Sequence, residues 1–149
     1  MRMAILVLGA ALSGVAAAQT VTAPQAQTLR SGSWSYAATA TGSDAAFMDS
    51  SGTAVLILRC TRANRSVILS VRGVPAASLA LWTSSVSRTL PATYDPASAR
   101  VGASLNANDP LLDAIAFSRG RFSVTVAGMA PLMFPAWPET ARAVEDCRN

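Results

Sequence analysis

The side chains of this chain that could do chemistry are carboxylates, serines and arginines. Asp109 and Asp113 are four residues apart, a spacing that would place an acid and a base on one helix face. Carboxylates at a helix N-terminus also cap the helix and stabilise its dipole, and we favour that structural interpretation. Glu145 and Asp146 are adjacent, so on a helix their side chains would point about 100° apart and would not share a proton.

Other catalytic groups are missing from the sequence. The 149 residues contain no His, and all twelve cationic residues are Arg. This excludes a histidine base, Ser/His/Asp and Cys/His relays, a His-bearing zinc site, a Schiff-base lysine and a P-loop lysine. Ser84, Ser85 and Ser118 lack the surroundings of a known serine nucleophile. We therefore expect no catalytic, cofactor or metal residue.

Arginines are the stronger candidates for a binding role. Arg59 and Arg72 are expected on the outward face of one hairpin, and Arg62 and Arg65 at its loop. The planar fork of arginine suits carboxylate or phosphate. We interpret these four residues and Trp82 as candidate contacts to another envelope protein or an anionic surface; alternatively, Arg simply replaces Lys throughout. The net charge of +4 is not concentrated in one block, so we expect no nucleic-acid partner.

Residues 1–18 have the three regions of a secretory signal peptide. Arg2 precedes an apolar run over residues 3–12, and small residues follow up to Ala16-Ala17-Ala18. The apolar run is shorter than the roughly 20 residues that span a bilayer. We predict cleavage before Gln19, export to the periplasm and no stable membrane anchor afterwards. The mature chain would carry eleven arginines against eight acids.

The two cysteines, Cys60 and Cys147, are expected to form a disulfide. Export would place them in an oxidising compartment, where an even number of cysteines favours pairing. A redox-active pair normally has Cys-x-x-Cys spacing, which this chain does not have.

Apolar and polar residues alternate most clearly at residues 53–60 and 66–72. This pattern predicts two strands, and the loop over residues 61–65 is short enough for a hairpin. Cys60 falls on the same face as Leu56 and Leu58, so we expect the disulfide at the core.

Four apolar residues fall on faces that should point outward: Val55, Ile57, Ile68 and Trp82. Either another layer covers them, such as the C-terminal helix, or they form an apolar patch for a partner. In a domain of this size we expect the covering layer.

The remaining pattern predicts a mobile tail over residues 19–33 and one domain over residues 34–149. We expect two short helices near the C-terminus. The first is capped by Asp109 and ends at Gly120; the second begins near Pro135, buries Trp137, Ala141 and Val144, and ends at Cys147. Arg142 and Asp146 are spaced to pair on the second helix.

Further strands are expected at residues 34–41, 45–48, 78–84, 87–92, 100–105, 121–127 and 131–134. The fold class is α+β: a mainly antiparallel, sandwich-like sheet with two helices and one disulfide.

The strand Leu56-Ile57-Leu58-Arg59-Cys60 and the ending Glu145-Asp146-Cys147-Arg148 resemble small exported alphaproteobacterial proteins, mostly uncharacterised, over roughly residues 34–148. The Leu-x-Leu-Arg-Cys strand is also similar to type VI secretion-associated periplasmic proteins of the VasI/TagO kind. The hairpin and helix at the end are similar to the invasion-associated locus B family, although this chain lacks that family's second cysteine pair. These resemblances imply a one-disulfide, β-rich domain and no active site.

From these observations we expect an exported periplasmic protein that acts as a non-catalytic binding or envelope-associated module. The alternatives are an inhibitor of a secreted enzyme and a carboxylate-dependent hydrolase. An enclosed polar cleft with two converging acids would favour the hydrolase, whereas a shallow apolar face rimmed by arginines would favour the module.

Overall fold

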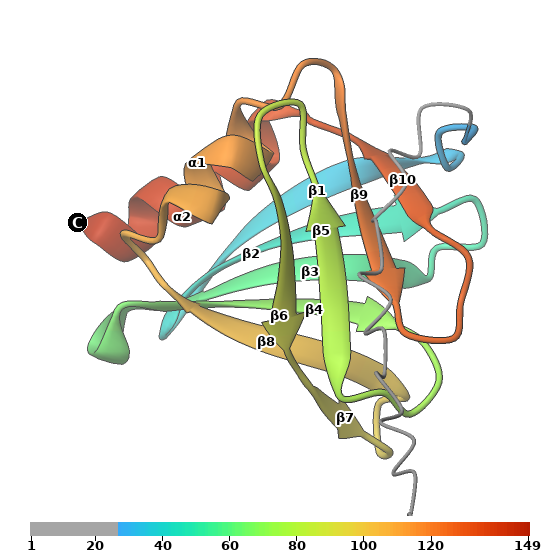
Figure 1. Ribbon diagram of the computed structural model, residues 1–149. Helices are drawn as coiled ribbons and strands as arrows, with labels where there is room; N and C mark the ends of the chain where they lie inside the picture. The colour runs from blue at the N-terminus through green and yellow to red at the C-terminus, as the bar shows by residue number, and fades with distance from the viewer. Residues whose placement is uncertain (1–26) are drawn as a thin grey trace, which may run out of the picture.

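Two antiparallel sheets face each other, and two helices lie at one end of the pair (Figure 1). The structure is a computed structural model that describes residues 27–149, so the signal peptide and residues 19–26 of the expected tail lie outside the described residues. A six-stranded sheet has the order β1-β2-β3-β4-β8-β7, and a four-stranded sheet has the order β10-β9-β5-β6. The prediction of an α+β fold, mainly antiparallel sheet with two helices and one disulfide, is confirmed.

The strands of the six-stranded sheet are β1 (Gly32–Thr39), β2 (Gly42–Asp49), β3 (Ala54–Thr61), β4 (Ser66–Arg72), β7 (Thr93–Asp95) and β8 (Arg100–Asn106). Those of the four-stranded sheet are β5 (Ser78–Trp82), β6 (Ser87–Pro91), β9 (Arg121–Val126) and β10 (Leu132–Pro135). The helices are α1 (Pro110–Ala116) and α2 (Pro138–Arg148), and a short 3₁₀ turn (Arg62–Asn64) connects β3 to β4.

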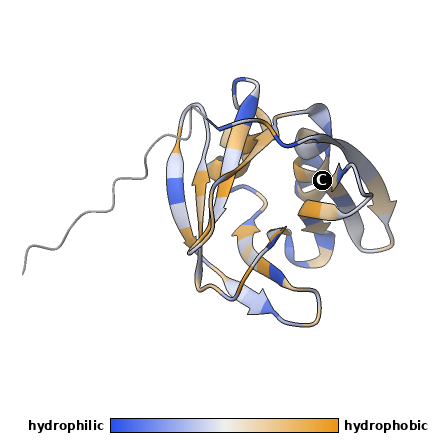
Figure 2. Ribbon diagram, turned by 90° about the vertical axis from the view of Figure 1, so that its right-hand side faces the viewer, coloured by the Kyte–Doolittle hydropathy of each residue, from blue (hydrophilic) through white to orange (hydrophobic). Residues whose placement is uncertain are grey.

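The core lies between the sheets because alternate residues of most strands point inward and those residues are apolar (Figure 2). Four aromatic rings join the two layers: Trp34 and Phe47 from the six-stranded sheet, and Phe122 and Phe134 from the four-stranded sheet. The ring centroids of Phe47 and Phe134 are 5.2 Å apart and edge-on, and those of Trp34 and Phe122 are 6.3 Å apart. The indole N–H of Trp34 donates to the carbonyl of Pro135 at 2.8 Å, which satisfies its polar atom inside this cluster.

The start of β2 differs from the sequence-based expectation. Residues 42–44 fall in the gap between the strands expected at residues 34–41 and 45–48, but they are paired in β2. A Cβ at Gly42 would clash with the carbonyl of Cys60, so the glycine allows the close approach of β2 to β3. Asp44 points outward and accepts two hydrogen bonds from Arg59 on the neighbouring strand. Glycine and aspartate are common in turns, but here Gly42 serves close packing of two strands and Asp44 pairs with Arg59.

Tertiary pairing also determines where β1 begins and why β7 is a strand. β1 begins at Gly32, two residues before the expected start at Trp34, and just upstream Leu29 forms a bridge to Met133 of β10. The short strand β7 was missed, because Tyr94-Asp95-Pro96 has a turn composition and only its pairing with β8 makes it a strand.

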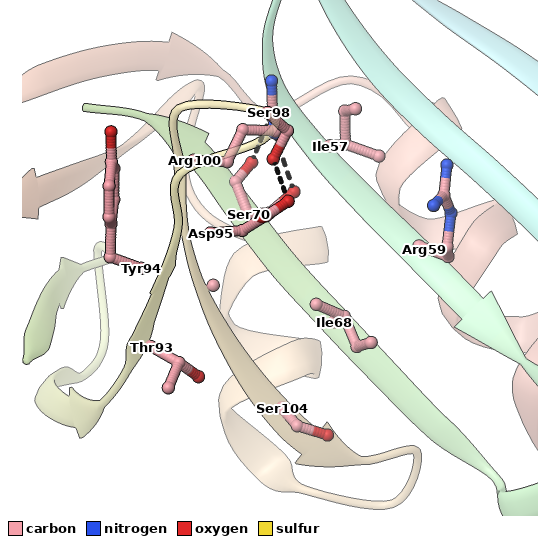
Figure 3. A pocket seen from close by; sticks show the side chains of 11 residues that line it. Ile57, Arg59, Ile68, Ser70, Thr93, Tyr94, Asp95, Ser98, Arg100 and Ser104 are labelled. Carbon is pink, nitrogen blue, oxygen red and sulfur yellow. Dashed lines mark hydrogen bonds between the residues drawn. The ribbon is translucent and has the colours of Figure 1, made fainter. Parts of the chain in front are cut away.

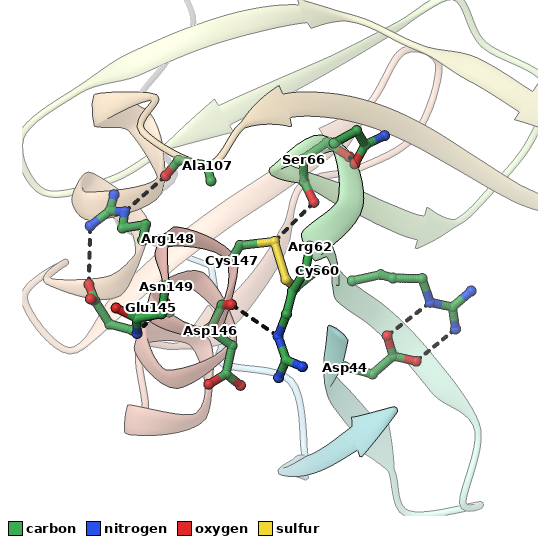
Figure 4. Close-up of a disulfide and its surroundings, with 12 residues drawn as sticks. Asp44, Cys60, Arg62, Ser66, Ala107, Glu145, Asp146, Cys147, Arg148 and Asn149 are labelled. Carbon is green, nitrogen blue, oxygen red and sulfur yellow. Dashed lines mark hydrogen bonds and ion pairs between the residues drawn. A yellow bond between two sulfur atoms is a disulfide. The ribbon is translucent and has the colours of Figure 1, made fainter. Parts of the chain in front are cut away.

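The disulfide between Cys60 and Cys147 attaches α2 to the middle of the six-stranded sheet (Figure 4). Both cysteines are fully buried, and their Cα atoms are 5.4 Å apart, within the usual range for a disulfide. The last turn of α2 continues this attachment: the side chain of Arg148 donates to the carbonyl of Ala107 and pairs with Asp113 of α1 at 2.8 Å. One helical turn therefore holds the sheet and the other helix together.

The buried face of α2 differs from the expected one. Thr140, Ala143, Val144 and Cys147 are buried, whereas Trp137 is 42 % exposed. The disulfide determines this rotation, because Cys147 must face Cys60, and Thr140 becomes acceptable there by donating its hydroxyl to the carbonyl of Trp137.

The expected pair between Arg142 and Asp146 on α2 is replaced by contacts to β1. Asp146 accepts a hydrogen bond from the hydroxyl of Tyr36, and the guanidinium of Arg142 lies 3.9 Å from the centre of the Tyr36 ring. Asp146 and Arg142 therefore both contact Tyr36 instead of each other. These contacts hold α2 against β1, in addition to the disulfide that holds it against β3.

Replacing both Cys60 and Cys147 by alanine is expected to lower the free energy of unfolding by about 4 kcal/mol, because the bond closes a long loop in the unfolded chain. Urea unfolding followed by circular dichroism measures the change. Thiol titration of the denatured, unreduced parent protein is the control and should find no free thiol. A loss of stability below about 1 kcal/mol would contradict the structural role of the disulfide.

Tyr36→Phe is expected to destabilise the protein by about 1 kcal/mol at neutral pH, because it removes the hydroxyl but keeps the ring under Arg142. The hydrogen bond from Tyr36 lowers the pKa of Asp146, so its contribution is present above the unfolded-state pKa and is lost as the pH falls through the lowered folded-state pKa. The stability difference between parent and variant should therefore shrink below about pH 4. A difference that is constant from pH 7 to pH 2 would show that Asp146 is not the partner.

Candidate functional site

A groove of about 570 Å³ lies on the outer face of the six-stranded sheet, the face that points away from the four-stranded sheet (Figure 3). Its volume is within the range of small-ligand sites. Strands β3, β4 and β8 form the floor, and β7 with the turn that follows it forms one wall. The lining residues are Ile57, Arg59, Ile68, Ser70, Thr93, Tyr94, Asp95, Ser98, Arg100, Gly102 and Ser104.

Strand register places the floor residues next to one another. Ile57 is opposite Ser70, Arg59 is opposite Ile68, and Ser70 is in turn opposite Gly102. Directly opposed residues share a face of a sheet, so alternate residues of three strands converge on one surface. Gly102 has no side chain to fill the space beside Ile68 and Ser70, which hollows the floor at this point.

The wall is a turn stabilised by Asp95. Its carboxylate accepts hydrogen bonds from the backbone N–H of Ala97 and from the hydroxyl of Ser98. The bond from Ser98, with that from Ala97, lowers the pKa of Asp95, so the group is ionised at neutral pH. Asp95 is the single acid among the lining residues, and both of its oxygens are occupied, so this groove contains no pair of converging acids.

Arg100 crosses the floor as a half-buried cation. Its guanidinium donates to the hydroxyl of Ser70 and to three carbonyl oxygens, those of Ala54, Val55 and Ser70, at 2.6–3.2 Å. Burial lowers the pKa of this guanidinium, and the charges of Arg72 and Arg59 lower it further. An arginine remains protonated at neutral pH despite such a shift. Neutral partners hold the group in place without cancelling its charge.

Three arginines therefore share the outer face, and one of them has a carboxylate partner. Arg59 pairs with Asp44 at 2.7 Å, and this bidentate contact raises the pKa of Arg59. Arg72 is exposed and directly opposite Arg100 in the register. Within residues 27–149, no carboxylate lies at ion-pair distance from Arg72 or Arg100. The groove combines an apolar floor with uncompensated positive charge.

We expected another layer, such as the C-terminal helix, to cover the outward apolar residues. For the C-terminal helix this expectation is wrong. The buried residues of α2 belong to the inner core with Cys60, on the opposite side of the sheet. Ile57 and Ile68 line the open groove instead, and Ile68 is 37 % exposed. Val55 is nearly fully buried, and the Arg100 side chain lies against its carbonyl.

The five candidate contact residues do not form one surface. Arg59 lines the groove and Arg72 lies beside Arg100, whereas Arg62 and Arg65 lie on the turn between β3 and β4 (Figures 1 and 4). There the Arg62 side chain approaches the carbonyl of Asp146 at 3.4 Å. Trp82 is half-buried on the four-stranded sheet. Only the first two of these residues belong to the groove region.

Each of the acids at the start of α1 has its own structural partner. Asp109 caps the helix by accepting from the N–H of Leu111 at 2.9 Å, and its second oxygen pairs with Arg88 at 2.7 Å. Burial opposes ionisation of Asp109, but these two bonds outweigh it and lower the pKa. Asp113 pairs with Arg148. The helix-capping interpretation of Asp109 is confirmed.

The serines considered above connect loops. The hydroxyl of Ser118 accepts from the N–H of Ser84 and donates to the carbonyl of Arg121, and the hydroxyl of Ser84 accepts from the N–H of Arg119. In the described part of the chain, no three His, Cys, Asp or Glu side chains are grouped so that they could hold a metal ion. Over the same residues, neither helix has the length and apolar character needed to cross a bilayer.

A scan against models of protein families found no match to this chain, and neither did searches of curated proteins and of solved structures. The resemblances stated from the sequence stay predictions.

Arg100 and Gly102 are two residues that shape the groove and that we did not single out from the sequence. Alternation in the strand at residues 100–105 was recognised and puts Arg100, Gly102 and Ser104 on one face, which was the available signal. The pairing of β8 with β4, which brings that face beside Ile68 and Ser70, is a long-range contact that the local pattern does not contain.

Arg100→Met is expected to lower the free energy of unfolding by about 2 kcal/mol, because buried carbonyls lose their donors. Arg72→Gln, on the same face but exposed, is the matched control and should change stability by less than about 0.5 kcal/mol. Urea unfolding measures both. Equal effects of the two substitutions would contradict the assigned role of Arg100.

Proposed function

We propose that this protein is an exported, non-catalytic binding module and that the groove on the six-stranded sheet is its ligand site. The observation that carries the proposal is the half-buried, uncompensated guanidinium of Arg100 beside the apolar side chains of Ile57 and Ile68. A ligand that complements such a site has an apolar portion and one anionic group, a carboxylate or phosphate.

The distribution of charge in the groove favours an anion. Within the described residues, Arg72 and Arg100 supply two positive charges without a carboxylate at ion-pair distance, against the single negative charge of the one lining acid, Asp95. Both Asp95 oxygens already accept hydrogen bonds within their own turn. Ser70, Ser104 and Thr93 add hydroxyl groups that donate to or accept from a ligand. The apolar floor contributes favourable transfer energy for the rest of the ligand.

The proposal includes export to the periplasm. It rests on the signal-peptide pattern of residues 1–18 and is supported by the buried disulfide, which is stable in an oxidising compartment. Mass spectrometry of the protein recovered from the periplasm of a Gram-negative expression host tests this part. The mass of a chain that begins at Gln19, reduced by the two hydrogens of the disulfide, supports it, and an intact N-terminus contradicts it.

Decanoate, which carries a carboxylate on an apolar chain, is the probe for the groove, and decanol is the matched neutral probe. We expect decanoate to bind more tightly than decanol and to shift the amide NMR signals of β3, β4 and β8. Gly102→Val should weaken decanoate binding at least about tenfold, because the new side chain fills the floor. A Cβ at Gly102 meets only ordinary contacts of 3.7–3.9 Å, so the variant should fold.

Ala80→Val is the control, since it also creates a valine, by adding two methyl groups, on the half-buried outer face of the four-stranded sheet. It should leave decanoate affinity unchanged. Arg72→Gln should weaken decanoate binding by a few fold and decanol binding not at all. Decanoate binding that is insensitive to Gly102→Val, or that shifts signals outside this sheet, would overturn the assignment of the groove.

A further inference from the structure

Three bulky apolar side chains are exposed at one end of the molecule. Val86 is 43 % exposed, Phe117 is 75 % exposed and Trp137 is 42 % exposed. They belong to the β5–β6 link, the α1–β9 link and the β10–α2 link, which all lie at the top of Figure 1. No internal packing role accounts for Phe117, whose side chain is largely in solvent.

Hydrogen bonds join these three links into one surface. The N–H of Ser84 donates to the hydroxyl of Ser118 at 3.0 Å, and the N–H of Arg119 donates to the hydroxyl of Ser84 at 2.9 Å. The N–H of Ala136 donates to the carbonyl of Gly120 at 3.2 Å. The apolar side chains are therefore presented from a connected platform.

Two arginines lie close together in the sequence at this end. Arg119 and Arg121 flank Gly120, and both are exposed. In the described residues, neither has a carboxylate at ion-pair distance. The three links contain no acid, and the nearest one along the chain is Glu139 in the first turn of α2.

We propose that Val86, Phe117, Arg119, Arg121 and Trp137, together called the loop-end patch, dock the protein on the surface of an anionic lipid bilayer. Tryptophan and phenylalanine partition into the interface between headgroups and acyl chains, and nearby arginines are attracted to anionic headgroups. Loop ends enter this region while the backbone of both sheets stays paired. The contact is peripheral and reversible, and it goes beyond ligand binding in the groove.

The shape of the patch favours a bilayer over a protein partner. Its apolar side chains stand on three separate links, not on a flat strand face, and the groove lies on a different surface. A fluid interface accommodates such separate projections without a complementary shape. The arginines of the loop-end patch complement the negative charge of the lipid surface.

The test uses the chain from residue 19, which contains every described element, with vesicles of phosphatidylcholine alone or mixed with phosphatidylglycerol. Co-sedimentation should show binding to the mixed vesicles and at least about tenfold weaker binding to phosphatidylcholine. Phe117→Ser combined with Trp137→Ser should weaken binding to mixed vesicles by at least about tenfold. Val74→Ser is the control: Val74 is 48 % exposed in the β4–β5 link, at the other end of the sheets.

The charged part of the patch is tested by Arg119→Gln combined with Arg121→Gln. Each arginine is expected to contribute about fivefold to the affinity for mixed vesicles. The matched control is Arg62→Gln combined with Arg65→Gln, which removes the same charge from the exposed turn between β3 and β4. Equal losses in both double variants would mean unspecific attraction of a cationic protein and would overturn the assignment of the patch.

Fluorescence gives a second readout. Trp34 is buried and Trp82 is half-buried, so Trp137→Phe is needed to assign the fluorescence change. A blue shift on adding mixed vesicles that Trp137→Phe abolishes would place Trp137 in the interface. Circular dichroism confirms that each variant is folded. Gly102→Val should bind vesicles like the parent, so failure of the groove proposal and failure of this one are distinguishable. A patch that binds a protein partner instead would not bind mixed vesicles. Absence of binding to mixed vesicles therefore refutes the inference.

Discussion

The bond between Cys60 and Cys147 is the constraint on which the arrangement of the other elements depends. It holds α2 against β3, an interior strand of the six-stranded sheet, and sets the rotation of the helix so that Cys147 faces the core. Arg148, one residue further, then reaches Asp113 of α1. Because both helices are committed to the inner side and one end of the sheets, the outer face of the six-stranded sheet stays uncovered.

Acids in the described chain are largely used for structure, which determines where positive charge remains. Asp44, Asp109 and Asp113 pair with arginines, Asp49 and Asp95 stabilise turns, and Asp146 accepts from Tyr36. The arginines left without a carboxylate include the pair beside the groove and the pair at the loop ends. Arginines outnumber the acids, and within residues 27–149 four of the arginines without an ion-pair partner lie at these two surfaces. Others, such as Arg62 and Arg65 on the turn between β3 and β4, lie elsewhere.

These two surfaces are separate in the structure and differ in chemistry. In the groove, three backbone carbonyls hold the side chain of Arg100 in place. In the proposed function this fixed geometry lowers the cost of ordering the site when a ligand binds. The apolar side chains of the loop-end patch belong to links between elements and are exposed. A module with both features would hold a small anionic ligand while lying on a membrane surface, with neither contact blocking the other.

The sequence by itself determined the fold class, most of the strands and the cap at Asp109, because period-two alternation and helix capping are local properties. It also determined the disulfide, because two cysteines allow only one pairing within the chain. Only the tertiary structure decided that Gly42 belongs to a strand, that Thr140 is buried while Trp137 is exposed, and that Ile57 and Ile68 are left uncovered. The groove depends on pairing β8 with β4 across a separation of some thirty residues. A strand's own pattern shows which residues share a face, but its neighbours in the sheet follow from the burial of the whole chain.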